Sequence, residues 1–68
     1  MANEYTITIY RAGGTWIADM SRSRRGREMK RLLGTTQVPT PYRDQTNGAT
    51  VALALITRNP GHTIIFWE

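Results

Sequence analysis

Residues 5–20 read YTITIYRAGGTWIADM, and this stretch decides the fold. Its first six residues alternate β-branched and aromatic types, which is typical of a half-buried β-strand. Gly13 and Gly14 follow, and two glycines can adopt positive φ at both central positions of a type I′ turn. A second alternating segment begins at Thr15. The stretch therefore predicts a β-hairpin.

The turn also predicts the register of this hairpin. A two-residue loop at 13–14 places Arg11 opposite Trp16 and Ile9 opposite Ala18, and it pairs the next inward residues in the same way. The apolar pattern independently requires the same register, because a slip of one residue would turn every apolar side chain outward. The predicted pairs are Ile7 with Met20 and Ile9 with Ala18. These four residues form the inner face of the hairpin together with Tyr5, and Trp16 closes one end of it.

The length and composition limit the class of protein. The 68 residues weigh 7.7 kDa, so residues 1–68 form a single domain, and 40% apolar content indicates a folded chain. There is no cysteine and one histidine, His62, which excludes a disulfide framework and a site made of several His ligands. We expect no metal and no cofactor. No apolar run reaches the ~18–20 residues of a membrane span and no signal peptide is evident, so we expect a cytoplasmic protein without membrane contact.

Small size also predicts self-association. A chain of about 60 residues buries only ~60% of the surface that its unfolded form exposes. No disulfide can add stability in a chain without cysteine. Small domains often gain the missing burial from a second copy. We therefore expect a homo-oligomer, most simply a two-fold dimer.

Residues 21–46 form a long connection with weaker signals. Residues 27–33 can form two helical turns, with Met29 and two leucines on one side, and Gly34 can end them. A short third strand is predicted at 35–38. Pro39 and Pro41 end its pairing or confine it to a sheet edge, because proline cannot donate to a β-ladder. A connection of this length either contains local structure or is functional.

Residues 47–68 allow two interpretations. In the first, Gly48–Arg58 is an Ala- and Leu-rich helix, started by Asp44, Thr46 or Asn47. Pro60 and Gly61 would follow its end. The residues expected to face the sheet are Val51, Ala52, Leu55 and Ile56. In the second, residues 50–57 form a strand that pairs with the last strand. We favour the helix, because two strands apolar on both faces would have no helix to cover them.

The final segment, 63–67, is predicted to be a strand with apolar residues on both faces. Ile64 and Phe66 can meet the helix. The opposite face then carries an apolar patch that has no cover in so short a chain, and such patches usually mark interfaces. We expect two subunits to meet there, through Tyr10, Ile17, Ile65 and Trp67. The alternative is that the 21–46 connection folds over this patch.

These elements predict a small α+β two-layer fold. An antiparallel sheet of three or four strands (a hairpin, a short third strand and a C-terminal strand) packs on one helix. The order of residues 5–10, the Gly13–Ala18 segment and the helix at 49–58 resembles the N-terminal domain of HicB antitoxins, whose fold is partly like a double-stranded-RNA-binding domain. The Pro-Asp-Leu-Pro-Gly stretch of that family is missing after residue 20. The resemblance implies topology more than antitoxin function. The chain is also similar in size and composition to small phage and mobile-element proteins.

The excess positive charge is confined to residues 22–31. This segment holds six basic residues and one acid, for a charge of +5, while the other residues hold three basic and four acidic ones, for −1. Arginine binds phosphate through a planar fork and stacks on bases. The predicted nucleic-acid-binding residues are Arg22, Arg24, Arg25, Arg27, Lys30 and Arg31. An acidic protein partner and a merely solvated, mobile loop are the alternatives.

The sequence contains no recognisable catalytic motif. His62 follows the Asn59-Pro60-Gly61 turn, and no carboxylate is placed beside it by any spacing that a general base requires. The glycine pair at 13–14 matches no phosphate-loop pattern. We therefore expect a non-enzymatic binding module that contacts nucleic-acid phosphates with low sequence specificity. The alternative is a protein-interaction or inhibitor module of a mobile element, acting through the apolar patch.

Overall fold

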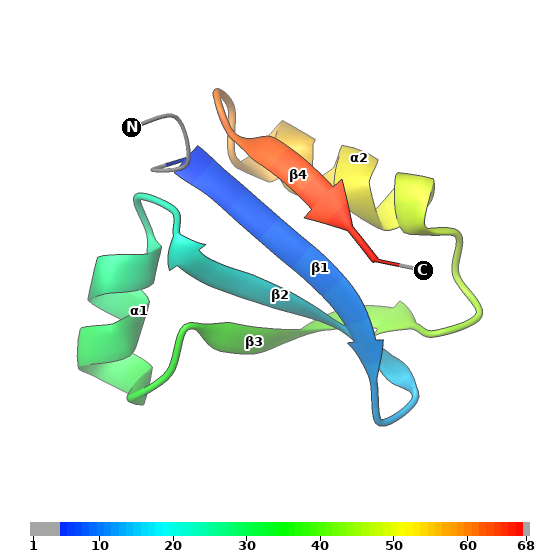
Figure 1. Ribbon diagram of the computed structural model, residues 1–68, viewed down its shortest axis with the longest axis horizontal. Coiled ribbons are helices and arrows are strands. Elements are labelled where there is room, and N and C mark those ends of the chain that lie inside the picture. The colour runs from blue at the N-terminus through cyan, green and yellow to red at the C-terminus, as the bar shows by residue number, and fades with distance from the viewer. Residues whose placement is uncertain (1–4, 68) are drawn as a thin grey trace.

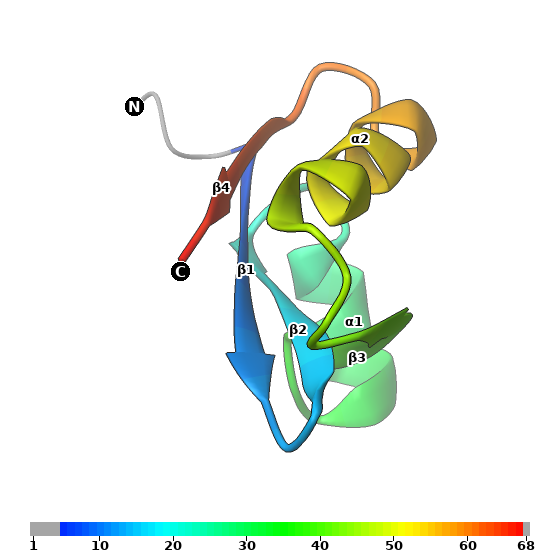
Figure 2. The same cartoon turned by 90° about the vertical axis from the view of Figure 1, so that its right-hand side faces the viewer.

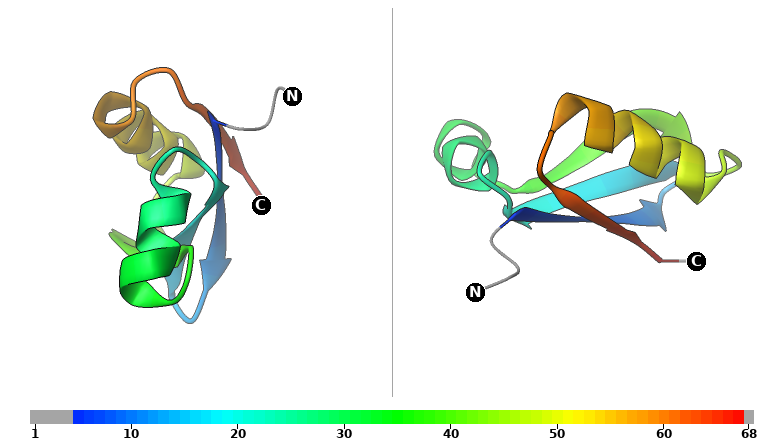
Figure 3. Two further views of the ribbon diagram at one scale, coloured as in Figure 1. Left: turned by 90° about the vertical axis from the view of Figure 1, so that its left-hand side faces the viewer. Right: turned by 90° about the horizontal axis from the view of Figure 1, so that it is seen from above.

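The computed structural model describes residues 5–67, which form four strands and two helices around one sheet. The strands lie in the order β3-β2-β1-β4 (Figure 1). Both helices lie on the same side of β1 and β4, so the opposite face of these strands carries no helix (Figures 2 and 3). The predicted α+β class is confirmed. The elements are β1 (Thr6–Ala12), β2 (Thr15–Arg22), α1 (Gly26–Leu33), β3 (Gln37–Arg43), α2 (Gly48–Arg58) and β4 (Thr63–Phe66).

The predicted hairpin is β1–β2, and its turn is the predicted one. Gly13 and Gly14 have φ values of 59° and 78°, as a type I′ turn requires. The pairs Arg11 with Trp16 and Ile9 with Ala18 are confirmed. The pair Ile7 with Met20 is wrong, because the register shifts between Thr6 and Thr8 and the ladder is irregular there.

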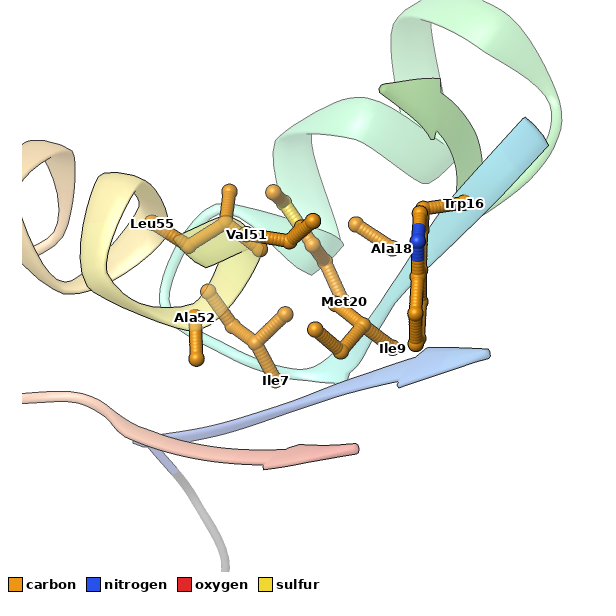
Figure 4. Close-up of a cluster of buried hydrophobic side chains, with 8 residues drawn as sticks. All are labelled: Ile7, Ile9, Trp16, Ala18, Met20, Val51, Ala52 and Leu55. Carbon is orange, nitrogen blue, oxygen red and sulfur yellow. The ribbon is translucent and has the colours of Figure 1, made fainter. Parts of the chain in front are cut away.

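The shift does not move the apolar side chains out of the core. Alternation is kept on the inner face, and the predicted inner residues are at most 7% exposed. Each large aliphatic side chain buried in this way contributes about 1.5–3 kcal/mol. Tyr5 does not share this face, since it precedes β1 and is 38% exposed. Figure 4 shows the core, which consists of Ile7, Ile9, Trp16, Ala18, Met20, Val51, Ala52 and Leu55.

Strand β3 is longer than predicted and continues through both prolines. It forms the predicted edge of the sheet and pairs only with β2. The Thr36 carbonyl accepts from the Met20 amide at 2.9 Å, so it points toward β2. Backbone groups alternate in direction along a strand, which turns positions 39 and 41 toward the free edge. Pro39 and Pro41 therefore cost no ladder bond and remove two donors from that edge.

Helix α1 occupies the predicted two turns and ends at Gly34, whose φ is 78°. Its first residue explains its close approach to the sheet. A Cβ on Gly26 would collide with the backbone carbonyl of Met20. Met29 packs against the core, but Leu32 and Leu33, which were predicted on the same side, are 68% and 61% exposed.

Helix α2 confirms the first interpretation of residues 48–58, and the strand interpretation is wrong. Asn47 caps its start, because its side-chain oxygen accepts from the Ala49 amide at 2.7 Å. Val51, Ala52 and Leu55 are buried as predicted. Ile56 was expected to face the sheet, but it is 44% exposed. It lies on the flank of the apolar stripe, about 100° round the helix from Leu55.

Strand β4 corrects the sheet direction. It pairs with β1 in parallel, so the sheet is mixed and not purely antiparallel, and there are two helices where one was predicted. The cause is the connection: a helix returns the chain across the sheet, so the strand that follows runs parallel to the strand that precedes it. Ile64 and Phe66 pack against the core, as predicted.

Candidate nucleic-acid interface

The six basic residues of the 22–31 segment lie at one end of the molecule, where α1 lies in Figure 1. Arg22 ends β2, Arg24 and Arg25 lie in the turn that follows, and the others belong to α1. All six side chains are exposed. We call this set the basic surface; it consists of Arg22, Arg24, Arg25, Arg27, Lys30 and Arg31.

Helix α1 presents its cations to solvent. Arg27 and Arg31 are four positions apart and share one face of the helix. Glu28 is the one acid of the segment, and its carboxylate lies 3.6 Å from the Arg31 guanidinium. Both side chains are more than half exposed, so this pair stabilises the helix by at most about 1 kcal/mol. Phosphate can therefore compete for Arg31 at little cost.

The turn before α1 is fixed by contacts with a distant segment. The Ser23 hydroxyl lies 3.0 Å from His62 Nε2, and it also accepts from the Arg25 amide at 3.2 Å. The Arg25 guanidinium lies 3.5 Å from the Asn59 side-chain oxygen. The base of the basic surface is thus joined to the turn between α2 and β4. The segment is a structured turn followed by α1, and not the mobile loop that was one of the alternatives.

An aromatic side chain supports one of the arginines. The Arg24 guanidinium lies 4.9 Å from the centre of the Tyr5 ring, within the range of a cation–π contact. The same ring meets His62 edge-on, with 5.9 Å between the ring centres. Tyr5, predicted to lie on the inner face of the hairpin, instead forms part of this end of the molecule. Sequence reasoning did not connect it with the arginines.

His62 has a defined arrangement. Its Nδ1 lies 3.1 Å from the Asn59 carbonyl, which can only accept, so Nδ1 donates there; in the neutral imidazole Nε2 then accepts from the Ser23 hydroxyl. A serine beside a histidine suggests a nucleophile, but Ser23 is 9% exposed and its oxygen already contacts both His62 and the Arg25 amide. No group of three His, Asp or Glu side chains that could hold a metal occurs within residues 5–67. The contacts favour a structural role for this pair.

The four predicted interface residues alternate along their strands with residues that face the core, so they belong to the other face of the sheet. That face carries no helix (Figures 2 and 3). Ile17 is the direct partner of Tyr10 across β1 and β2, and the Trp67 amide donates to Ile9 at the end of β4. Trp67 is 64% and Ile65 44% exposed, while Tyr10 and Ile17 are half-buried. We call this set the outer patch. Of the 21–46 segment, Gln37 touches this patch, since its side-chain oxygen accepts from the Tyr10 hydroxyl at 3.1 Å, while α1 lies on the opposite face (Figures 2 and 3).

A groove that the sequence did not indicate lies on the other face, between α2 and β3. Helix α2 packs against β4 and leaves this side open. Arg58, the last residue of α2, borders the groove and is the one charged residue among those that line it. Only the fold brings Arg58 beside β3, so no local pattern could have singled it out.

No protein-family model, no curated protein and no solved structure matches this chain. The resemblance to the HicB antitoxin N-terminal domain therefore stays a prediction. Within residues 5–67, neither helix has the length and apolar character that a membrane span needs.

Proposed function

We propose that the protein is a binding module whose basic surface contacts the phosphates of nucleic acids. One observation carries the proposal: six exposed cations project from the end of β2, the turn that follows and α1, and side-chain contacts join that turn to the turn between α2 and β4. Glu28 is the one acid in that segment, and it engages a single arginine. Five of the six cations are arginines, which recognise phosphate oxygens in pairs.

The expected binding depends on charge and not on base sequence. Each phosphate that the surface neutralises releases condensed counterions, so affinity falls steeply as salt rises. Helix α1 has eight residues and is about 12 Å long at 1.5 Å per residue, so it can follow only a short stretch of backbone. Helix α1 contains no Asn or Gln, the side chains that read adenine, and we assign its arginines to phosphates. Low sequence specificity follows.

The test is fluorescence anisotropy with short labelled RNA and DNA over a series of salt concentrations. The variant R22Q/R27Q/K30Q removes three charges from the basic surface. The matched control R11Q/R43Q/R58Q removes three charges from elsewhere in the molecule. Binding that weakens with salt, is lost in the first variant and persists in the control supports the proposal. Absence of binding at low salt, or equal weakening by both variants, contradicts it.

A second function is favoured by the outer patch. We propose that two subunits meet through Tyr10, Ile17, Ile65 and Trp67, because these apolar side chains share a face without a helix. A contiguous apolar patch on a small protein usually marks an interface. Light scattering at tens of micromolar measures the oligomeric state. A dimer that dissociates in the variant I65E supports this surface, and a monomeric wild type contradicts it.

A further inference from the structure

The groove between α2 and β3 has two apolar walls and an apolar floor. Ala18 and Met20 of β2 form the floor, and the helical wall includes Ala54 and Leu55. On β3 the half-buried residues are the alternate ones, as expected for side chains on the inner face. The residues of β3 that line the groove are Val38, Pro39, Thr40, Pro41 and Tyr42.

The groove has few polar side chains, and they differ in whether they already have a hydrogen-bond partner. The Thr40 hydroxyl is occupied, since it donates to the Trp16 carbonyl at 2.8 Å. The Arg58 side chain makes no hydrogen bond or ion pair within residues 5–67, and no acid lines the groove. One unpaired cation thus borders an otherwise apolar surface. A carboxylate is the group that complements it best.

The contacts of α2 show at which end of the groove Arg58 lies. The N-terminal end of α2 lies beside Trp16, because a Cβ on Gly48 would touch that ring. The C-terminal end lies beside the turn before α1, because Asn59 contacts Arg25 there. Arg58 therefore lies at the end nearest to the basic surface, and the apolar part of the groove extends away from it toward Trp16.

The size of the groove indicates the kind of occupant. Its volume is about 130 Å³. Pockets for drug-sized ligands measure about 300–1,000 Å³, which is larger. An engineered apolar cavity of about 150 Å³ in another protein holds a benzene molecule. The groove therefore fits one large apolar side chain, such as phenylalanine or leucine, better than a whole cofactor.

We propose that this groove docks a protein partner, which inserts one large apolar side chain and sets an Asp or Glu carboxylate against Arg58. The apolar lining selects the first group and the unpaired guanidinium selects the second. Peptide grooves commonly combine such an apolar anchor with a charged contact. The groove uses none of the residues of the basic surface, so this proposal stands apart from nucleic-acid binding.

The first arm of the test uses 3-phenylpropanoate, which joins a phenyl ring to a carboxylate, and follows backbone amides by NMR at millimolar concentrations. The amides of Val38, Thr40 and Tyr42 and those of residues 54–58 are expected to shift. The uncharged 3-phenylpropanamide is expected to bind roughly tenfold more weakly, as is the carboxylate to R58Q. A54L, which fills the groove from a half-buried position, is expected to abolish the shifts. The proposal is overturned if no shifts occur, or if the carboxylate binds R58Q as tightly as wild type.

The second arm tests whether the groove binds a peptide segment, as a protein partner would supply. A random peptide library is selected on wild type and on R58E, which keeps the groove but reverses its charge; amide spectra first verify that each variant is folded. Wild type is expected to enrich peptides with Phe or Leu near an acid, and R58E is expected to exchange the acid for a base. R27Q, a basic-surface variant, is expected to enrich the same peptides as wild type. Enrichment of acidic peptides without an apolar residue, loss of enrichment in R27Q, or no enrichment overturns the proposal.

Discussion

The hydroxyl oxygen of Ser23 lies 3.0 Å from Nε2 of His62, although 39 positions separate the two residues in the chain. The contact joins the turn before α1 to the turn after α2. Three further contacts, from Arg25 to Ser23, from Arg25 to Asn59 and from His62 to Asn59, surround it. The end of the molecule that carries most of the positive charge is thereby joined to the turn between α2 and β4.

The substitution Ser23→Ala tests this connection. It leaves His62 Nε2 and the Arg25 amide without their partner in a half-buried place, so we expect the free energy of unfolding to fall by about 1–2 kcal/mol. Urea denaturation measures the change. Ser21→Ala is the control, because the Ser21 side chain is exposed and its contact uses the backbone amide. Equal stability of the two variants would show that the Ser23 contact contributes little.

Glu28→Gln is expected to strengthen nucleic-acid binding. It removes the acid of the basic surface and frees Arg31 from its ion pair. We expect an increase in affinity of about threefold at low salt, declining as salt screens the charges. Asp44→Asn makes the same change in net charge at the far end of β3. If both variants bind equally well, net charge and not the basic surface determines affinity.

Gly26→Ala is expected to destabilise the protein although alanine is the better helix former. The added Cβ would collide with the Met20 carbonyl, which is backbone and cannot rotate away. Overpacking of this kind costs about 1–3 kcal/mol. Thermal unfolding followed by circular dichroism measures it. Lys30→Ala in the same helix should change stability by less than about 0.5 kcal/mol, and a Gly26→Ala protein as stable as that control would disprove the close packing.

P39V/P41V is expected to make the protein associate more strongly. The two valines restore amide donors to the free edge of β3, and such an edge is a template for pairing with another chain. Light scattering over a concentration series measures the average mass. P60A, a proline substitution in the α2–β4 turn, controls for a general loss of rigidity. A mass profile identical to that of wild type would mean that these prolines do not protect the edge.

The two tryptophans are expected to report different environments. Trp16 is fully buried and its Nε1 donates to the Thr46 carbonyl at 3.0 Å, while Trp67 is 64% exposed. W67F should therefore retain blue-shifted emission that acrylamide quenches poorly. The emission of Trp67 is the difference between the spectra of wild type and W67F. In dilute wild-type protein, acrylamide should quench this emission easily. If the outer patch forms a dimer, that quenching should decline as protein concentration rises; a constant value contradicts the dimer.

The hairpin and α2 could be predicted because two independent signals agreed in each. In the hairpin, the glycine pair and the apolar alternation required the same register. In α2, helix formers lay between a capping Asn47 and a proline. The direction of β4 could not be predicted, because a short strand that is apolar on both faces reads the same in either direction. Its direction depends on the crossover through α2.

The candidate site was predictable only in part. A charge count locates the basic surface, because all six cations lie within ten consecutive residues. The contacts that hold it, from Ser23 to His62 and from Arg25 to Asn59, join residues more than 30 positions apart and leave no local pattern. The same is true of Arg58 in the groove. Tyr5 was misplaced because alternation cannot show where a strand begins.

The parallel pairing of β4 with β1 has a consequence for synthesis. The hairpin can form as soon as residues 6–22 emerge from the ribosome, but its first strand then lacks its other neighbour. That neighbour is residues 63–66, and its Thr63 lies 57 positions after its partner Thr6 in the chain. Contacts so distant in sequence form slowly, since a long loop must close first. Until then the inner side chains of β1 stay open to solvent, so a stalled or truncated chain would expose them to chaperones and proteases.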